Sequence, residues 1–410
     1  MKPLEGVRVL DVTRIVSGPT CCFHLAALGA EVIRVEAPGG DVTWNVPPFV
    51  GPEGAHRGER GPRDIALSPL RRGRGKRSVE IDLKCEAGQT LLKRLAVRSD
   101  VLVENFRPGV MEALGLDYAS LEAINPRLVY CSITGYGHDG PYRDRPSVDL
   151  VVQAVSGLMA KTGFADGPPT KVGATIGDQV PGIYAALGIV SALRQRDLEG
   201  RGQWLDVAML DSLIALLWDE PIDDFEEQGV PERVGNGDPR GSPIGTYPTS
   251  DGWVAVVCVG EKAWERVAAL MGREDMIERW PRAQQRRENS EEIDLAVSAW
   301  TKKRTTDEAV DQLIAIGMAA GPIQSPWSGK RDPQVLHRGA LEPLRHPDQE
   351  APSQYWGPAL PIRMSRAELR PSPAEVLGSS TDAVLRELLD LDDTELQKLR
   401  RDGVVGNDAV

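Results

Sequence analysis

The sequence predicts an α/β fold, in which a mainly parallel sheet with helices is joined to a smaller α+β domain. Apolar strand-like segments alternate with helical segments through the first half of the chain, which is typical of a parallel sheet. A hairpin pattern followed by helical patterns comes later. The chain has 410 residues, 41% of them hydrophobic, which is too long for one ordinary core. Two domains are therefore expected.

The first elements form a βαβ crossover. Residues 7–12 read as a buried strand, and the turn Ser17-Gly18-Pro19-Thr20 leads into a helix that Gly29 ends. Residues 31–36 are the next strand. Further strands are expected over residues 78–83, 101–105 and 128–134, with a helix over 87–98. Ligands of such sheets lie beyond the carboxyl ends of the strands, which indicates Ser17, Asn105 and residues 135–140.

The remaining elements fit a second, smaller domain. The polar stretch 223–242 predicts a linker or mobile loop, and Ser250-Asp251-Gly252 predicts the turn of a hairpin over residues 246–259. The expected helices are 182–196, 211–218, 264–271, 291–302, 307–316, 382–389 and 393–401, with a strand over 203–209.

The composition of the chain argues against several classes of protein. Lysine and arginine number 48 against 60 acidic residues, for a net charge of -12, so general nucleic-acid binding is not expected. The N-terminus lacks the apolar stretch of a signal peptide, and no run is expected to span a bilayer. The five cysteines lack zinc spacing and predict reduced thiols in a cytoplasmic protein: Cys21, Cys22, Cys85, Cys131 and Cys258.

Asp178 is the candidate catalytic residue. It precedes the helix expected from Gly182, where a carboxylate is most often a simple N-cap. The alternative is a carboxylate nucleophile whose anion the helix N-terminus stabilises. Spacing alone leaves both open.

Three other segments are candidates for ligand binding. The basic run Arg57–Arg77 is either a solvated loop or an anion site. Asn105-Phe106-Arg107 is either a turn or a platform on which a nucleotide ring stacks. Gly235-Asn236-Gly237 is either a flexible linker or a lid that shields a reactive intermediate. No serine-hydrolase motif, P-loop or metal-spaced histidine pair is present.

An ordered set of motifs resembles the class III CoA-transferases, which include formyl-CoA, carnitine and bile-acid CoA-transferases. The matching segments are Leu4–Asp11, Gly18-Pro19, Leu28–Glu36, Lys76–Leu83, Val103–Gly109, Asn125–Leu128, Gly135–Gly137, Gly177-Asp178 and Gly200–Gln203. They run in order across the first half of the chain.

The resemblance implies a Rossmann-like large domain, made from both ends of the chain, and an interlocked homodimer. The domains would then be residues 1–215, the small domain 216–330 with its linkers, and the return 331–410. It also implies that Asp178 carries CoA from an acyl-CoA thioester to a free carboxylic acid, through mixed anhydrides and an aspartyl-CoA thioester. Succinyl-CoA is a plausible donor. No metal or redox cofactor is required, and neither nucleic acid nor membrane is an expected partner.

The resemblance also assigns binding residues. Lys76 and Arg77 would hold the CoA phosphates, and Asn105, Phe106 and Arg107 would line the nucleotide or pantetheine path. Backbone donors near Ser17 or residues 135–140 would stabilise oxyanions. The expected substrate and CoA site comprises Val16, Ser17, Lys76, Arg77, Asn105, Phe106, Arg107, Tyr136, Gly137, Asp149, Gly235, Asn236 and Gly237.

Two departures narrow the function. Members that use formyl-CoA and oxalate carry glutamine at the position of Val16, so oxalate is not expected. The acyl-CoA racemases of the same family carry a histidine where Val148 stands, and valine cannot carry a proton, so racemisation is disfavoured. A third alternative is a CoA-binding protein without catalysis, for which neither Asp178 nor a lid is needed.

Overall fold

The computed structural model describes residues 1–406, which divide into two compact units. The large unit comprises Met1–Ser156, Gly173–Leu216 and the described part of the chain from Pro333. The small unit comprises Gly157–Val172 and Leu217–Asp332. The chain therefore leaves the large unit twice. The first excursion, Gly157–Val172, lies inside the segment that the sequence assigns to the large domain.

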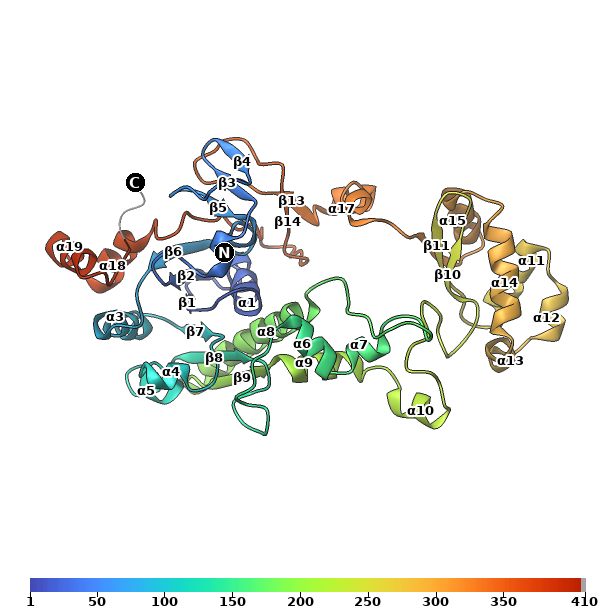
Figure 1. The fold of residues 1–410 in the computed structure, drawn as a ribbon, viewed down its shortest axis with the longest axis horizontal. Coiled ribbons are helices and arrows are strands. Elements are labelled where there is room, and N and C mark those ends of the chain that lie inside the picture. Colours follow the sequence, from blue (N-terminus) through green and yellow to red (C-terminus); the bar gives the residue numbers. More distant parts are fainter. Residues whose placement is uncertain (407–410) are drawn as a thin grey trace. The chain divides into compact units, whose positions relative to one another are not determined.

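A six-stranded parallel sheet forms the centre of the large unit (Figure 1). Its spatial order is β6-β2-β1-β7-β8-β9, which in order of appearance in the sheet is 3-2-1-4-5-6, that of dinucleotide-binding folds. The strands are β1 (Arg8–Asp11), β2 (Glu31–Glu36), β6 (Lys76–Glu80), β7 (Val101–Glu104), β8 (Val129–Thr134) and β9 (Trp204–Ala208). The order reverses between β1 and β7, where such folds bind their ligands.

The helices of the large unit follow the predicted pattern with small shifts. The long helix α8 begins earlier than expected, so that Asp178 lies in its first turn and not before it. The helices here are α1 (Ser17–Ala27), α3 (Glu86–Val97), α4 (Val110–Ala113), α5 (Tyr118–Glu122), α6 (Asp149–Val155), α8 (Ile176–Glu199) and α9 (Met209–Leu217).

By length and composition alone, α8 could cross a membrane, which contradicts the expectation that no segment could. Its packing gives another reason for its apolar sequence. It contacts α1, α6, β8 and β9, and it buries Ala185, Ile189 and Leu193. A core helix of a globular domain passes the same test, so the feature is weak evidence for a membrane span.

The segment between β2 and β6, which includes most of the basic run, is folded and not a loop. It contains η1 (Val42–Asn45), β3 (Phe49–Gly51), β4 (Gly54–His56), β5 (Ile65–Ala66) and α2 (Leu67–Arg72). The returning chain begins with α17 (Pro333–Arg338). Its β13 (Leu341–Pro343) and β14 (Trp356–Pro358) pack against this segment, where Arg74 bonds to Glu342 and Pro358. It then adds α18 (Thr381–Leu389) and α19 (Asp393–Arg401), whose leucines complete the core beside β6 and α3. Both ends of the described chain thus build one unit.

The small unit has its own core. The predicted hairpin is present as β10 (Ile244–Pro248) and β11 (Trp253–Val257), and β12 (Ala319–Pro322) adds a third antiparallel strand. Trp264 is fully buried between this sheet and the helices. The helices of the small unit are α7 (Leu158–Lys161), α10 (Ile222–Glu227), α11 (Glu261–Met271), α12 (Asp275–Arg279), α13 (Ala283–Glu288), α14 (Ser290–Thr301), α15 (Thr306–Ala315) and α16 (Pro326–Gly329).

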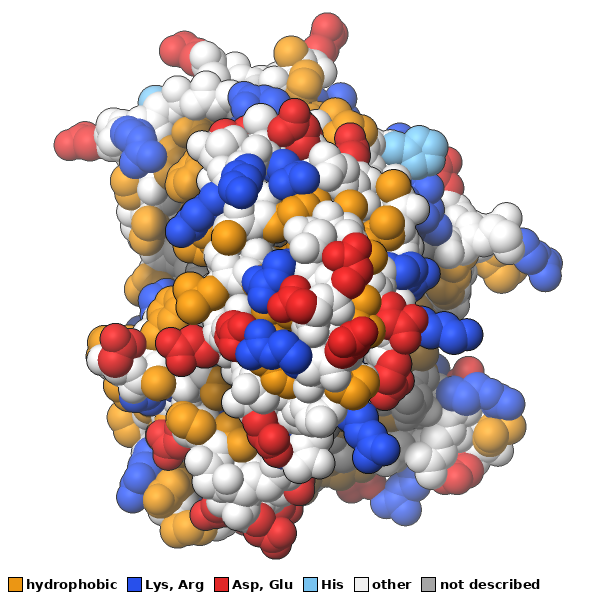
Figure 2. Space-filling view, turned by 90° about the vertical axis from the view of Figure 1, so that its right-hand side faces the viewer, with side chains coloured by type: hydrophobic (Ala, Val, Ile, Leu, Met, Phe, Trp, Pro, Cys, Tyr) orange, Lys and Arg blue, Asp and Glu red, His pale blue; other side chains and the backbone are white. Residues whose placement is uncertain are grey.

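The surface seen in Figure 2 carries acidic and basic side chains in close alternation, with apolar groups between them. No broad basic patch covers this face. The pattern agrees with the net charge of -12, and on this face it offers a nucleic-acid backbone no continuous positive surface.

Candidate active site

A cavity of about 350 Å³ opens where the strand order reverses. The loops after β1, β7 and β8 supply most of its wall, and the end of β8 and the first turns of α1, α6, α8 and α9 supply the rest. Its lining residues are Ile15, Val16, Ser17, Asn105, Phe106, Arg107, Pro108, Ile133, Thr134, Gly135, Arg143, Arg145, Ser147, Val148, Asp149, Leu150, Asp178 and Met209. Seven of the predicted site residues therefore meet in one place: Val16, Ser17, Asn105, Phe106, Arg107, Asp149 and Asp178.

Asp178 is half-buried in this cavity, in the first turn of α8. Burial and the negative charge of Asp149 raise the pKa of its carboxyl to about 6, against the opposing positive charge of Arg72. At pH 7 the group is still mostly ionised, and it is more basic than an ordinary carboxylate. This combination suits a nucleophile, which must be charged and reactive at once.

Asp149 fixes the position of Asp178. Its Oδ1 accepts the backbone N–H of Gly177 at 2.8 Å, which joins the start of α6 to the start of α8. The side-chain amide of Gln153 donates to both Asp149 oxygens at 3.0 Å. Asp149 lines the cavity, as predicted for a binding residue, but these bonds give it a positioning role as well.

Asn105 joins the loop after β1 to the end of β7. Its amide donates to the carbonyl of Arg14 at 2.9 Å and to Ser17 Oγ at 3.3 Å, and its Oδ1 accepts the N–H of Arg14. Arg14 in turn lies over the ring of Phe106 at 4.6 Å. These contacts hold the N-terminus of α1 against the cavity, where the first N–H groups of the helix have no partner within the helix.

The chain is strained beside this helix start. Ile15 has φ of 66°, a left-handed conformation that a β-branched residue rarely adopts, and its N–H is held by Asp41 at 2.8 Å. Such strain concentrates at functional sites. No feature of the sequence pattern indicated it.

Sequence comparison assigns the family. The model of CoA-transferase family III matches residues 4–378. The chain belongs to CoA-transferase family III. It is therefore an enzyme of the CoA-transferase class, as the sequence motifs implied.

Named relatives and a solved structure agree. The chain is 34% identical to succinyl-CoA–D-citramalate CoA-transferase of Chloroflexus aurantiacus over 98% of each chain. It is 34% identical to succinyl-CoA:glutarate CoA-transferase of Homo sapiens over 99% of this chain and 90% of the relative. The fold matches the crystal structure of a CAIB/BAIF family protein from Brucella suis with a TM-score of 0.81 at 34% identity, over 94% and 99% of the two chains.

The structure corrects the predicted role of Lys76 in this transferase. The Lys76 ammonium is enclosed, donating to Asp11 Oδ2 at 2.7 Å and to the carbonyl of Pro19 at 3.0 Å. Only 1% of its side chain is exposed. An ammonium so enclosed stabilises the core beside β1, and a CoA phosphate cannot reach its remaining N–H.

Arg77 also lies away from the cavity. It stands near the start of β6, and it pairs with Glu31 and Glu387, each at 2.9 Å. Glu31 begins β2, so this network lies at the amino edge of the parallel sheet, opposite the ligand edge. Arg77 therefore does not line this cavity, and its contact with a CoA phosphate stays a prediction.

Most of the basic run is likewise bonded within the large unit. Arg63 pairs with Asp348, Arg74 pairs with Glu342, and Arg60 lies over Trp44. These arginines of the run are therefore held by contacts within the unit, and an anion site there stays a prediction. Arg72 is the exception, since its charge acts on Asp178.

Tyr136 and Gly137 support the cavity wall without lining it. Tyr136 packs edge-on against Tyr142, and the N–H of Gly137 donates to Thr134 Oγ1 at 2.9 Å. The N–H of His138 donates to Asp206 at 2.8 Å. Both N–H groups already have acceptors within the protein, so they are not free to stabilise an oxyanion. Of the donors predicted for that role, the N–H groups at the start of α1 are therefore the better candidates.

The predicted lid belongs to the small unit and is held there. Gly235 donates to the carbonyl of Gly163 at 2.9 Å, and a Cβ at Gly235 would meet the ring of Phe164 at 2.6 Å. The amide of Asn236 donates to Thr246 Oγ1 at 2.8 Å. Gly237 follows in the same bonded segment, and its N–H donates to Val234. The lid function stays a prediction.

Val148 lines the cavity at the N-cap of α6, where a racemase would carry its histidine. Among the described residues that line this cavity there is no histidine. The nearest in sequence, His138, belongs to a different pocket. The wall therefore lacks the imidazole that α-proton transfer in a racemase uses.

Sequence reasoning missed Arg143 and Arg145. Both line the cavity, and they belong to the long loop after β8. Arg143 is paired weakly with its neighbour Asp144 at 3.7 Å, and Arg145 lies over the ring of Tyr142 at 3.6 Å. Two arginines in the loop that follows a strand were a signal for an anion site, which the denser basic run Arg57–Arg77 obscured.

Proposed function

We propose that this enzyme transfers CoA from an acyl-CoA thioester, with succinyl-CoA as the physiological donor, to a free dicarboxylic acid. The observation that carries the proposal is Asp178: a half-buried carboxylate in the wall of the cavity at the reversal point of the sheet. The named relatives, which use succinyl-CoA with D-citramalate or glutarate, support this donor and this acceptor class.

The reaction begins with attack of Asp178 Oδ on the donor thioester carbon. CoA leaves as a thiolate, and a mixed anhydride joins Asp178 to the acyl group. The thiolate then attacks the aspartyl carbonyl carbon, which releases the donor acid as a carboxylate and leaves an aspartyl-CoA thioester. Each step moves an electron pair without net proton transfer, so no general base is needed.

The second half repeats these steps in reverse order with the acceptor. Its carboxylate attacks the aspartyl thioester, which releases CoA thiolate and forms a second anhydride. The thiolate attacks the acceptor carbonyl, which yields the new acyl-CoA and regenerates the Asp178 carboxylate. N–H groups at the start of α1 are proposed to stabilise the tetrahedral oxyanions. Neither metal nor redox cofactor takes part in the proposed scheme.

Arginines around the cavity support a doubly charged acceptor. Arg107, Arg143 and Arg145 line it, and the Arg107 guanidinium has no hydrogen-bond or ion-pair partner within residues 1–406. A guanidinium binds a carboxylate with two parallel hydrogen bonds. Since one carboxylate of the acceptor must reach Asp178, the other is available to an arginine. Val16 is apolar, which argues against the small polar acceptor oxalate.

We further propose that the chain acts as a homodimer in the cytoplasm. One face of α8 supports the dimer, since it exposes Ile183, Tyr184, Leu187 and Leu198 by 42% to 69%. Clustered apolar side chains on one helix face are typical of an interface. Interlocking of the two chains is proposed from the family resemblance alone.

Mass spectrometry of the CoA products tests the proposed reaction. The enzyme is incubated with succinyl-CoA and, in turn, glutarate, D-citramalate, oxalate and butyrate. We expect glutaryl-CoA or citramalyl-CoA to form, little product from oxalate or butyrate, and none from the Asp178→Asn variant. Product formation by Asp178→Asn at the wild-type rate would overturn the proposal.

A further inference from the structure

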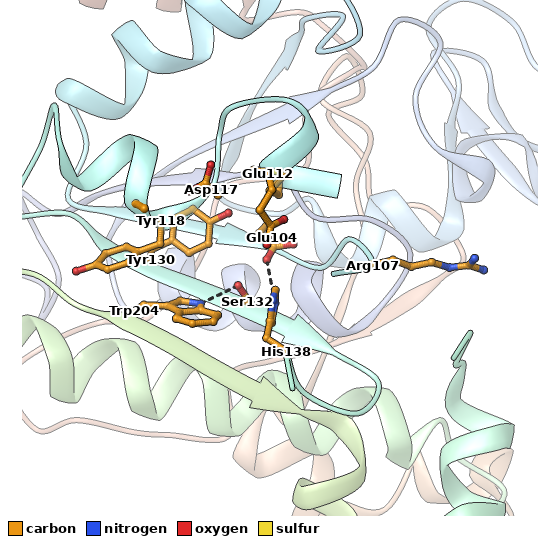
Figure 3. A pocket seen from close by; sticks show the side chains of 11 residues that line it. Glu104, Arg107, Glu112, Asp117, Tyr118, Tyr130, Ser132, His138 and Trp204 are labelled. Atoms are coloured by element: carbon orange, nitrogen blue, oxygen red, sulfur yellow. Dashed lines mark hydrogen bonds and ion pairs between the residues drawn. The ribbon is translucent and has the colours of Figure 1, made fainter. Parts of the chain in front are cut away.

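A second cavity of about 190 Å³ lies in the large unit, beside the catalytic one (Figure 3). Glu104, the last residue of β7, faces it from one side, and His138, in the loop after β8, faces it from the other. The rest of its wall comes from α4, α5, β8 and β9. The proposed transfer reaction uses none of these groups except Arg107, which lines both cavities.

His138 lacks a hydrogen-bond partner at one ring nitrogen. Imidazole Nε2 of His138 is buried and has no hydrogen bond within residues 1–406, and its nearest acid is Glu104 Oε1 at 3.9 Å. Glu104 is 2% exposed, and its Oε2 accepts the N–H of Phe106 at 2.8 Å. A buried polar atom without a partner is costly, and in native proteins it usually marks a site that something else completes.

The other polar groups of the wall are already engaged. Trp204 Nε1 donates to Ser132 Oγ at 3.0 Å, and Ser132 bonds to Glu104. The hydroxyl of Tyr130 donates to the carbonyl of Leu116 at 3.3 Å. Asp117 caps α5 by accepting the N–H of Ser120. The groups that remain for a ligand are Glu104, Glu112, His138 and the aromatic faces.

The wall favours positive charge. It carries three carboxyl groups, Glu104, Glu112 and Asp117, against one guanidinium, which Figure 3 shows directed away from Glu104 and His138. Tyr118 and Trp204 lie nearly parallel, with ring centroids 6.5 Å apart. Carboxylates beside aromatic faces are the combination that binds organic ammonium ions. The catalytic cavity, lined by three arginines, has the opposite preference.

The pKa of Glu104 agrees with a cavity that favours a positively charged ligand. Burial raises it to about 7, so in the empty cavity the carboxyl is protonated about half of the time near neutral pH. A cation bound next to it would stabilise the carboxylate form.

We propose that this cavity is a binding site for a small organic ammonium ion, which donates hydrogen bonds to Glu104 and packs against Tyr118 and Trp204. The ammonium group lies beside Glu104 Oε1 and His138 Nε2, within hydrogen-bond distance of both, and it supplies the hydrogen-bond partner that the buried imidazole lacks. The assignment does not depend on the transfer reaction.

Isothermal titration calorimetry on the full-length protein tests the site. The probe is 2-phenylethylammonium, and 2-phenylethanol is the uncharged molecule of similar shape. We expect the ammonium to bind at least about tenfold more tightly than the alcohol, because only it pairs with the carboxylates. The Asp178→Ala variant should bind the ammonium as the wild type does, which separates this site from the catalytic cavity.

Variants locate the binding. Glu104→Gln and Glu112→Gln should each weaken ammonium binding, the first by about tenfold, and Ala119→Trp should block it by filling the mouth. Glu86→Gln, an exposed acid elsewhere in the large unit, is the matched control and should bind normally. Should Glu104→Gln not fold, the other two variants decide. Equal affinity for alcohol and ammonium, absence of ammonium binding at millimolar concentrations, or unchanged affinity in the cavity variants would overturn the proposal.

Discussion

At the scale of single residues, Asp178 shows how catalysis and stability oppose each other. Burial and the neighbouring charge of Asp149 raise its pKa to about 6, so holding this group ionised costs folding free energy. The same surroundings make the carboxylate more basic and so a better nucleophile. We therefore expect the folded protein to become more stable when the charge of this group is removed.

We expect Asp178→Asn to stabilise the protein at pH 8 while abolishing transfer. The folded pKa of about 6 exceeds the ordinary value of 3.8, so the protonated carboxyl favours the folded state below pH 4. That contribution is lost as pH rises through 6, which costs at most about 3 kcal/mol. Chemical unfolding at pH 8 should show a gain of about 1–3 kcal/mol for the variant, and at pH 3.5 the difference should vanish.

Asp139→Asn is the matched control, because Asp139 is an exposed acid of the same unit. It should change the free energy of unfolding little at either pH. An equal effect of Asp178→Asn at both pH values would contradict the raised pKa.

Asp149 is expected to set the acid limb of the activity profile. Because its charge raises the pKa of Asp178, Asp149→Asn should lower that pKa. The fall of kcat/KM at low pH, centred near pH 6 in the wild type, should then move to lower pH. The asparagine oxygen can still accept the N–H groups of Gly177 and Gln153, while the bond from Gln153 to the second oxygen is lost. If the fall of kcat/KM stays near pH 6 in Asp149→Asn, a group other than Asp178 controls it.

At the scale of elements, the site depends on the close approach of α1 and α8. A Cβ at Gly182 would lie 2.7 Å from the carbonyl oxygen of Ser17 and 3.2 Å from Thr20. The absence of a side chain there lets the two helices meet. Their contact brings Asp178 to the cavity that Ser17 also lines.

Gly182→Ala should therefore separate the helices. We expect a loss of stability of about 1–3 kcal/mol from overpacking and a fall in kcat of at least about tenfold from displacement of Asp178. Gly188→Ala, on the same helix, is the control, because its Cβ would meet only the flexible end of Leu205 at 3.2 Å. Chemical unfolding and steady-state kinetics measure both. Equal effects of the two substitutions would contradict the claim that the close approach of α1 and α8 at Gly182 positions Asp178.

The elements themselves were largely predictable from the sequence. β2 begins and ends where the apolar run predicts, and the hairpin turns at Ser250–Gly252 as its composition requires. Local patterns fix such elements because burial and turn chemistry act within a few residues. Asp178, Val16 and Asn105 were predicted as site residues and do share one cavity.

The misses share a physical cause. Lys76 looked like a ligand-binding cation, but its partner Asp11 comes from a distant part of the chain, as do the partners Glu31 and Glu387 of Arg77. A local pattern cannot show which charges pair after folding. Likewise, the early start of α8 and the strain at Ile15 arise from tertiary contacts, Asp149 with Gly177 and Asp41 with Ile15.

At the scale of the whole molecule, the proposed homodimer predicts the mass in solution. Light scattering should give twice the chain mass of 44.6 kDa. Leu187, on the exposed face of α8, is 61% exposed, and Leu187→Glu should shift the protein toward monomer or weaken its assembly. Leu295→Glu, on α14 and 65% exposed, is the matched control and should leave the mass unchanged. A wild-type protein of single-chain mass would contradict the dimer.

The central claim is that Asp178 carries the acyl group and then CoA. Its most direct test is mass spectrometry of the protein after incubation with succinyl-CoA, followed by trapping with hydroxylamine or borohydride. We expect a modification that maps to the peptide containing Asp178 in the wild type and is missing in Asp178→Ala. An Asp178 that stays unmodified while new acyl-CoA accumulates would contradict covalent transfer through this residue.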